Sequence, residues 1–77
     1  NFEMRNINLS IVDNDHTVLS RRLTDKVLSS GYFRLADVSP RYDEALVSIE
    51  SNAADIILEI PSRFEERLER EGTARWF

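Results

Sequence analysis

The pattern of apolar and polar positions switches repeatedly between the period of a strand and the period of a helix. Residues 7–12 combine alternation with a continuous apolar end, which is typical of a strand buried on both faces. Leu19, Leu23 and Val27 then recur at i, i+4 and i+8, which predicts an amphipathic helix. Gly31 follows this helix and suits the left-handed position after its last turn. The first third of the chain therefore predicts a strand followed by a helix.

The same alternation continues in the middle of the chain. Residues 32–38 are rich in aromatic and apolar side chains and predict a second strand. Ser39 and Pro40 predict a helix start, because Ser can cap the helix and Pro fits its first position. We expect this second helix to run to about Glu50. Its apolar positions follow i, i+3, i+4, i+7 spacing, at Tyr42, Ala45, Leu46 and Ile49.

The last part of the chain predicts a third strand and a third helix. Residues 55–60 contain the most aliphatic run, so we expect a central strand with helices on both sides, ended by Pro61. Ser62 and Glu65 have the spacing of a capping box, which predicts a helix start there. Gly72 is expected to end that helix. Its expected buried positions are Phe64 and Leu68.

This order of elements, βαβαβα, predicts an α/β fold with three layers and a short, mostly parallel sheet. Right-handed crossovers favour the strand order 2-1-3. We interpret residues 1–77 as one domain fragment, with residues 1–6 as a lead-in and residues 73–77 as the start of a further strand. A truncated sheet leaves an unpaired edge that can recruit a second copy, so a homodimer is one expected form of the fragment.

Composition excludes several classes of protein. The 77 residues are 42% hydrophobic and 31% charged, which indicates a folded domain. The net charge is −4 without a block of Lys or Arg, so nucleic acid is not an expected partner. Cysteine is absent, which excludes disulfides, thiolate metal sites and a cysteine nucleophile. The longest aliphatic run, residues 56–58, is far shorter than the roughly 20 residues that cross a bilayer.

The main candidate for chemistry is the acidic bend at residues 13–16. In open α/β sheets ligands bind beyond the carboxyl ends of the strands where the strand order reverses, and order 2-1-3 puts that point at this bend. Asp13 and Asp15 could hold a hard cation such as Mg²⁺ through their oxygens. The structural alternative is that Asp13 shapes the turn while Asp15 or Thr17 caps the following helix.

An enzymatic interpretation of the bend is a small Mg²⁺-dependent phosphotransfer or phosphatase-like domain. Asp13, Asp15 and Thr17 resemble the first motif of haloacid-dehalogenase-type phosphatases, in which the first Asp is the nucleophile. That chemistry also needs a lysine near the site, but Lys26 is the only lysine and is expected to face away. The third strand ends in Ile60 and Pro61. It therefore lacks the acidic pair that the phosphatase would need, and also the phosphate-accepting Asp of a response-regulator receiver.

Two further charged features have structural interpretations. His16 lies among carboxylates that could keep it charged near neutral pH, although a solvated turn histidine is the simpler interpretation. The last helix places Glu66 four residues before Arg70, and Arg67 four residues before Glu71. Such spacing is typical of a solvated surface of mutually paired charges.

The order of several short motifs resembles a known family. Val12-Asp13-x-Asp15-x-Thr17-x-x-Ser20-Arg21-x-Leu23 is similar to the segment that follows the first membrane helix of type-2 ABC exporter permeases. Further similarities are Ser30-Gly31-Tyr32-Phe33, and Ile60-Pro61-x-x-Phe64-Glu65-x-x-Leu68 followed by Gly72. The resemblance covers about residues 7–72. Thr17 stands where the family has Ser, and Glu59 where it more often has an apolar or small residue.

The resemblance implies a non-catalytic, extracytoplasmic (periplasmic) domain of a bacterial efflux permease, anchored in the inner membrane by flanking helices. It implies no cofactor, because energy would come from an ATP-binding subunit or domain across the membrane. The expected partners are the rest of the permease, the transported substrate and a periplasmic adaptor. Asp13, Asp15, Ser20 and Arg21 would form the framework of the motif, with Arg21 available to bridge to a carboxylate. Pro61 and Phe64 would begin the last helix.

Overall fold

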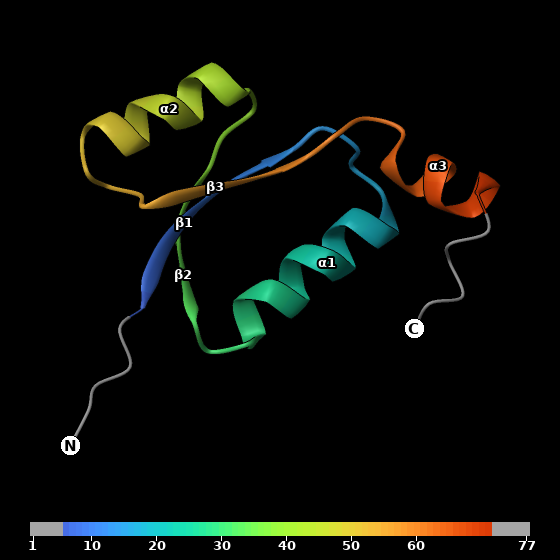
Figure 1. Ribbon diagram of the computed structural model, residues 1–77, viewed down its shortest axis with the longest axis horizontal. Coiled ribbons are helices and arrows are strands. Elements are labelled where there is room, and N and C mark those ends of the chain that lie inside the picture. The colour runs from blue at the N-terminus through green and yellow to red at the C-terminus, as the bar shows by residue number, and fades with distance from the viewer. Residues whose placement is uncertain (1–5, 72–77) are drawn as a thin grey trace.

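The structure, a computed structural model, describes residues 6–71 and shows three strands alternating with three helices (Figure 1). The elements are β1 (Ile7–Asp13), α1 (Val18–Ser29), β2 (Phe33–Val38), α2 (Tyr42–Glu50), β3 (Ile56–Ile60) and α3 (Phe64–Arg70). All strands are parallel in the order β2-β1-β3, which confirms the predicted α/β fold and the strand order 2-1-3. The first five residues of the expected lead-in, 1–6, lie outside the described residues, as do the helix end at Gly72 and the further strand at residues 73–77.

The helices lie on both sides of the sheet. Figure 1 shows α2 on one side of the strands and α1 on the other. α1 contacts β2, whereas α2 contacts β1 and β3. α3 follows the carboxyl end of β3 and contacts α1. The molecule is therefore a thin slab of 42 × 34 × 15 Å, and its shortest dimension reflects the width of only three strands.

The central strand is β1 and not the third strand, so that part of the sequence prediction is wrong. β1 pairs with β2 along one edge and with β3 along the other. It supplies three of the six buried hydrophobic residues of the described chain, which are Leu9, Ile11, Val12, Ala45, Ala54 and Ile60. β3 lies at an edge of the sheet, where Ile56 is 45% exposed. An aliphatic run is thus no measure of centrality in a sheet this narrow.

The first helix begins and ends as expected, but the second does not. Gly31 has φ +91°, which confirms its left-handed position after α1. α2 begins after Arg41 without a side-chain cap, so the predicted start at Ser39 and Pro40 is wrong. The backbone N–H of Ser39 donates to the carbonyl of Ile11 at 2.8 Å, which continues the pairing of β1 with β2. Ser39 therefore continues the strand pairing, and its hydroxyl donates to Asp37 at 3.3 Å.

A bulge in β2 brings one carboxylate to the α2 side of the sheet. Leu9 pairs with Leu35, but Ser10 pairs with Asp37, so Ala36 is an extra residue in β2. Since paired residues of parallel strands share a face, the bulge turns Asp37 toward the face of Ser10. Without the bulge, alternation would leave Asp37 on the face of Leu35.

Asp37 joins two strands and a helix through hydroxyl donors. The fully buried Ser10 donates to its Oδ1 at 2.5 Å, Ser39 donates to the same oxygen at 3.3 Å, and Ser48 of α2 donates to Oδ2. The Ser10 hydroxyl, followed by that of Ser48, holds the pKa of Asp37 below its ordinary value. Asp37 interrupts the apolar pattern of the second strand, and its side chain joins α2 to the sheet.

We expect Asp37→Ala to lower the free energy of unfolding by about 2 kcal/mol, because it leaves the buried Ser10 hydroxyl without its acceptor. Urea denaturation followed by circular dichroism measures this loss. Asp25→Ala on the exposed side of α1 is the matched control and should change stability by less than about 0.5 kcal/mol. Equal urea midpoints for Asp37→Ala and the unsubstituted chain would show that the hydrogen bonds to Asp37 add no stability.

Candidate functional site

The candidate site is the bend that connects β1 to α1. Asp13, the last residue of β1, accepts hydrogen bonds at Oδ1 from the backbone N–H groups of Asp15 (2.9 Å) and His16 (3.0 Å). Its Oδ2 accepts the Ser20 hydroxyl at 2.8 Å. His16 has φ +56°, a left-handed conformation that the bond from its N–H to Asp13 helps to hold. Asp13 therefore shapes the turn, as one interpretation of the sequence predicted.

Thr17 and Ser20 form a reciprocal cap at the start of α1. The Thr17 hydroxyl accepts from the Ser20 backbone N–H at 3.1 Å, and the Ser20 hydroxyl accepts from the Thr17 N–H at 2.9 Å. This confirms Thr17 as the cap of the following helix. Ser20 is completely buried, and the Thr-x-x-Ser spacing was the sequence signal for its role.

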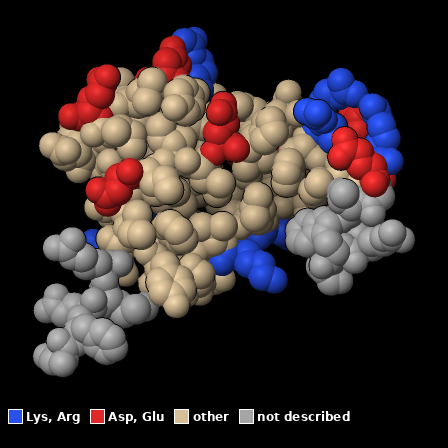
Figure 2. Space-filling view, in the orientation of Figure 1, with Lys and Arg blue, Asp and Glu red and all other residues tan. Residues whose placement is uncertain are grey.

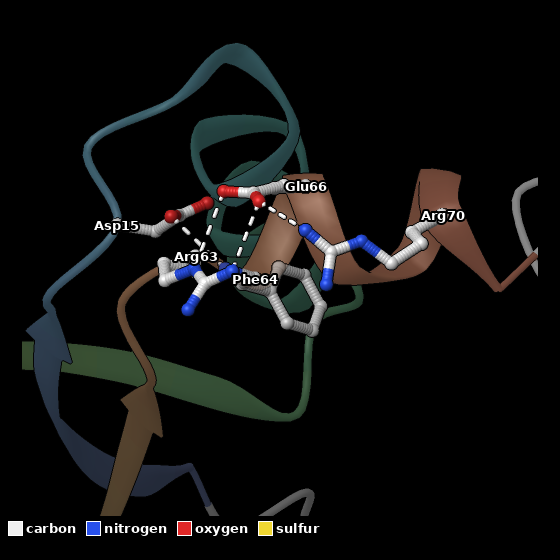
Figure 3. Close-up of polar contacts among 5 residues, drawn as sticks. All are labelled: Asp15, Arg63, Phe64, Glu66 and Arg70. Atoms are coloured by element: carbon white, nitrogen blue, oxygen red, sulfur yellow. Dashed lines mark hydrogen bonds and ion pairs between the residues drawn. The ribbon is translucent and has the colours of Figure 1, made fainter.

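Asp15 caps a helix, but the helix is α3 and not α1 (Figure 3). Its Oδ1 accepts from the backbone N–H of Phe64 at 3.0 Å, and its Oδ2 accepts from the N–H of Glu65 at 3.0 Å. Oδ2 also accepts the Thr17 hydroxyl at 2.7 Å. One carboxylate therefore satisfies two of the amides that a helix start leaves unpaired, and ties α3 to the cap of α1.

The predicted capping box of Ser62 and Glu65 is wrong. The residue before α3 is Arg63, which makes no side-chain cap and has φ +64°. The Glu65 amide is taken by Asp15, so a local cap is not needed. Sequence reasoning missed this contact because Asp15 lies 49 and 50 residues from its two backbone partners, beyond any local spacing rule.

Asn14 closes the same bend against the third strand. Its backbone N–H donates to the carbonyl of Ile60 at 2.9 Å, one step beyond the paired residues of β1 and β3. Its side-chain Nδ2 donates to Oε2 of Glu59 at 3.3 Å. The exposed Glu59, unusual for the family that the motifs resemble, therefore lies beside the bend. Pro61 follows directly and is exposed.

The electrostatics of the bend favour charged carboxylates. Burial raises the pKa of Asp13, but the His16 N–H, the Ser20 hydroxyl and the Asp15 N–H together hold it below its ordinary value. The Thr17 hydroxyl, aided by the amides at the start of α3, lowers the pKa of Asp15. Each carboxylate accepts three hydrogen bonds from the chain itself. Both are therefore used as fixed acceptors.

Arg21 does not join the two carboxylates. Among residues 6–71, no ion pair links Arg21 to Asp13 or Asp15, so the expected bridge is not formed. Its side chain is exposed at a depression of about 430 Å³ on the outer side of α1. The other residues around this depression are His16, Thr17, Val18, Arg22 and Asp25.

Charged side chains gather over α3 (Figure 2), and Asp15 of the bend lies beside its first turn (Figure 3). Glu66 pairs with Arg63 at 3.0 Å and with Arg70 at 2.6 Å, which confirms the predicted pairing of Glu66 with Arg70. The predicted pair of Arg67 with Glu71 is not formed, although both residues are described. All three paired side chains are more than half exposed, so these pairs contribute little stability.

The described chain offers no ready-made metal centre, since no three His, Asp or Glu side chains within it are grouped to hold an ion. No described helix combines the length and apolar character that crossing a membrane requires. Comparison with protein-family models, curated proteins and solved structures finds no match to this chain. The geometry of the bend is therefore the main basis for interpreting it.

We expect acid to destabilise the fold, because folding lowers the pKa of several carboxyl groups. A carboxyl whose pKa falls on folding contributes stability above the pKa of the unfolded chain, about 3.9, and loses it as pH drops through the folded pKa. Asp13, Asp15 and Asp37 are of this kind. The free energy of unfolding should be nearly constant from about pH 7 to 5 and should fall below about pH 4. Urea titrations at each pH measure it.

Asp13→Asn should make that loss on acidification smaller. The Asn Oδ1 can still accept from Asp15 and His16, while its Nδ2 can donate to Ser20 if that hydroxyl donates to the Thr17 carbonyl, 3.0 Å away. The bend thus keeps its hydrogen bonds and loses one titrating group. An unchanged dependence of stability on pH would mean that Asp13 has an ordinary pKa in the folded chain.

Proposed function

We propose that this chain is a non-catalytic extracytoplasmic domain of a bacterial ABC-type efflux permease. It would contribute to transport by contacting the substrate, a periplasmic adaptor or the partner permease. The ATP-binding subunit or domain would act on it only indirectly, from the other side of the membrane. In this role the domain itself holds no cofactor.

The observation that carries the proposal is the contact between Asp15 and the start of α3. The resemblance rests on two motifs, at residues 12–23 and 60–68, that lie far apart in the sequence. Asp15 of the first motif binds the backbone of Phe64 and Glu65 of the second. Asn14, between the two aspartates, binds the carbonyl of Ile60, the first residue of the second motif. The two motifs thus contact each other at one place in the fold, which gives a physical reason for them to occur in the same chain.

The use of the carboxylates supports a non-catalytic role. A carboxylate has about four acceptor positions, so three hydrogen bonds from the chain leave little capacity for nucleophilic attack or for magnesium coordination. In this bend the oxygens of Asp13 and Asp15 accept bonds from amides and hydroxyls of the chain. Asp13, Asp15, Thr17 and Ser20 therefore have a sufficient role as the framework of a fold.

The location can be tested by cysteine labelling in cells, because this chain contains no cysteine. In the parent protein, freed of any other cysteines, we expect Val47→Cys to react with a membrane-impermeant maleimide in intact cells. Val47 is 60% exposed on α2. Ala45→Cys, at a fully buried position of the same helix, should react only after denaturation. Labelling of Val47→Cys only after cell lysis would contradict the proposal.

The parent gene provides an independent test. We expect the coding sequence on each side of this segment to encode an apolar stretch of about 20 residues, enough to cross a bilayer as a helix. Sequencing through both flanks decides this directly. Flanks without such stretches would exclude the permease, whatever the cellular location of the domain.

A further inference from the structure

α3 is attached to the rest of the molecule more weakly than either of the other helices. α1 contains the buried Ser20 and α2 contains the buried Ala45, but no residue of α3 is buried. Phe64 and Leu68, its apolar residues, are only half-buried. Because buried apolar area is the main source of docking energy, these two side chains give α3 a smaller docking energy than α1 gains from its four half-buried apolar residues, Leu19, Leu23, Val27 and Leu28. Segments of this kind open more easily than the core of a domain.

The hydrogen bonds that join α3 to the acidic bend lie at its first turn. Asp15 accepts from the amide of Phe64, as Figure 3 shows, and from the amide of Glu65; both bonds measure 3.0 Å. The side chain of Arg63 makes no cap of its own and instead pairs with Glu66 in the exposed first turn. One side chain from another element therefore carries the polar connection at the start of this helix.

The connection of β3 to α3 contains a strained residue. Arg63 has φ +64°, a conformation that costs a non-glycine residue energy and persists only where its surroundings impose it. The segment from Pro61 to Arg63 is exposed and is neither strand nor helix. Opening at this point would release the strain at Arg63, whereas docking to Asp15 maintains it.

We propose that α3 is a hinged arm that opens as a unit about residues 61–63, with Asp15 as the clasp that keeps it closed, while the three-stranded sheet stays folded. The clasp is specific to a carboxylate. Both of its oxygens face backbone N–H donors, so an Asn side chain in either orientation turns its own NH₂ group toward one of them. This inference rests on these contacts and not on the proposed transport role.

Amide hydrogen exchange and Cα chemical shifts of the 77-residue chain test the arm. In Asp15→Asn we expect exchange at residues 64–70 to accelerate about tenfold and their Cα shifts to move toward random-coil values. Amides of β1 and β3 should exchange at the same rates as in the unsubstituted 77-residue chain. Asp13→Asn is the matched control, because it makes the same chemical change two residues away and keeps its hydrogen bonds; it should leave α3 unaffected.

A second variant acts in the opposite direction and does not depend on the stability of Asp15→Asn. Arg63→Gly relieves the cost of the left-handed conformation, so it should slow exchange at residues 64–70 severalfold. Unchanged exchange in α3 of Asp15→Asn would exclude the clasp. Equal acceleration in α3 and the sheet would show that they unfold together, and would overturn the hinged arm. Faster exchange in Arg63→Gly would also count against it.

Discussion

The structure depends on hydrogen bonding by three carboxylates, because its apolar core is small. Only six hydrophobic residues are buried among those described, and three of them belong to β1. A chain of this size buries a smaller fraction of its surface than larger domains do, so packing alone gives little stability. Asp37 joins α2 to the sheet, Asp13 fixes the turn into α1, and Asp15 holds α3. Each helix is thus secured by one acidic side chain.

The position of β1 explains why two of these carboxylates lie together. Among the strands of residues 6–71, β1 alone has neighbours on both sides, so the bend at its carboxyl end lies next to the exits of the other two. Asn14 extends the pairing to Ile60, and this brings the start of α3 within reach of Asp15. The same edge of an α/β sheet often holds ligands because helix starts converge on it. Here the convergent amides are bound by the chain itself.

Local sequence rules predicted what local contacts determine. The strand and helix periods gave all six elements and the order 2-1-3, and Thr17 and Gly31 were placed correctly because their roles involve only nearby backbone. The errors arose where a distant partner intervened. Ser39 had the local features of a cap, but its N–H pairs with Ile11 of β1. Ser62 was expected to accept from the Glu65 amide, but that amide donates to Asp15. The bulge at Ala36, which reorients Asp37, left no distinct mark on the apolar pattern.

The acidic bend shows why the role of two aspartates is ambiguous from sequence, whereas the structure distinguishes cation binding from helix capping much better. Carboxylates that bind a cation and carboxylates that cap helices can occupy the same place in an α/β fold, since ligands bind beyond the carboxyl ends of the strands, where the following helices also begin. The distinction lies in which donors their oxygens face. Asp13 and Asp15 face amides and hydroxyls of two helices and a turn, so both carboxylates join elements of the fold. Asp15 has the wider effect, because its partners lie on an element that has no other buried anchor.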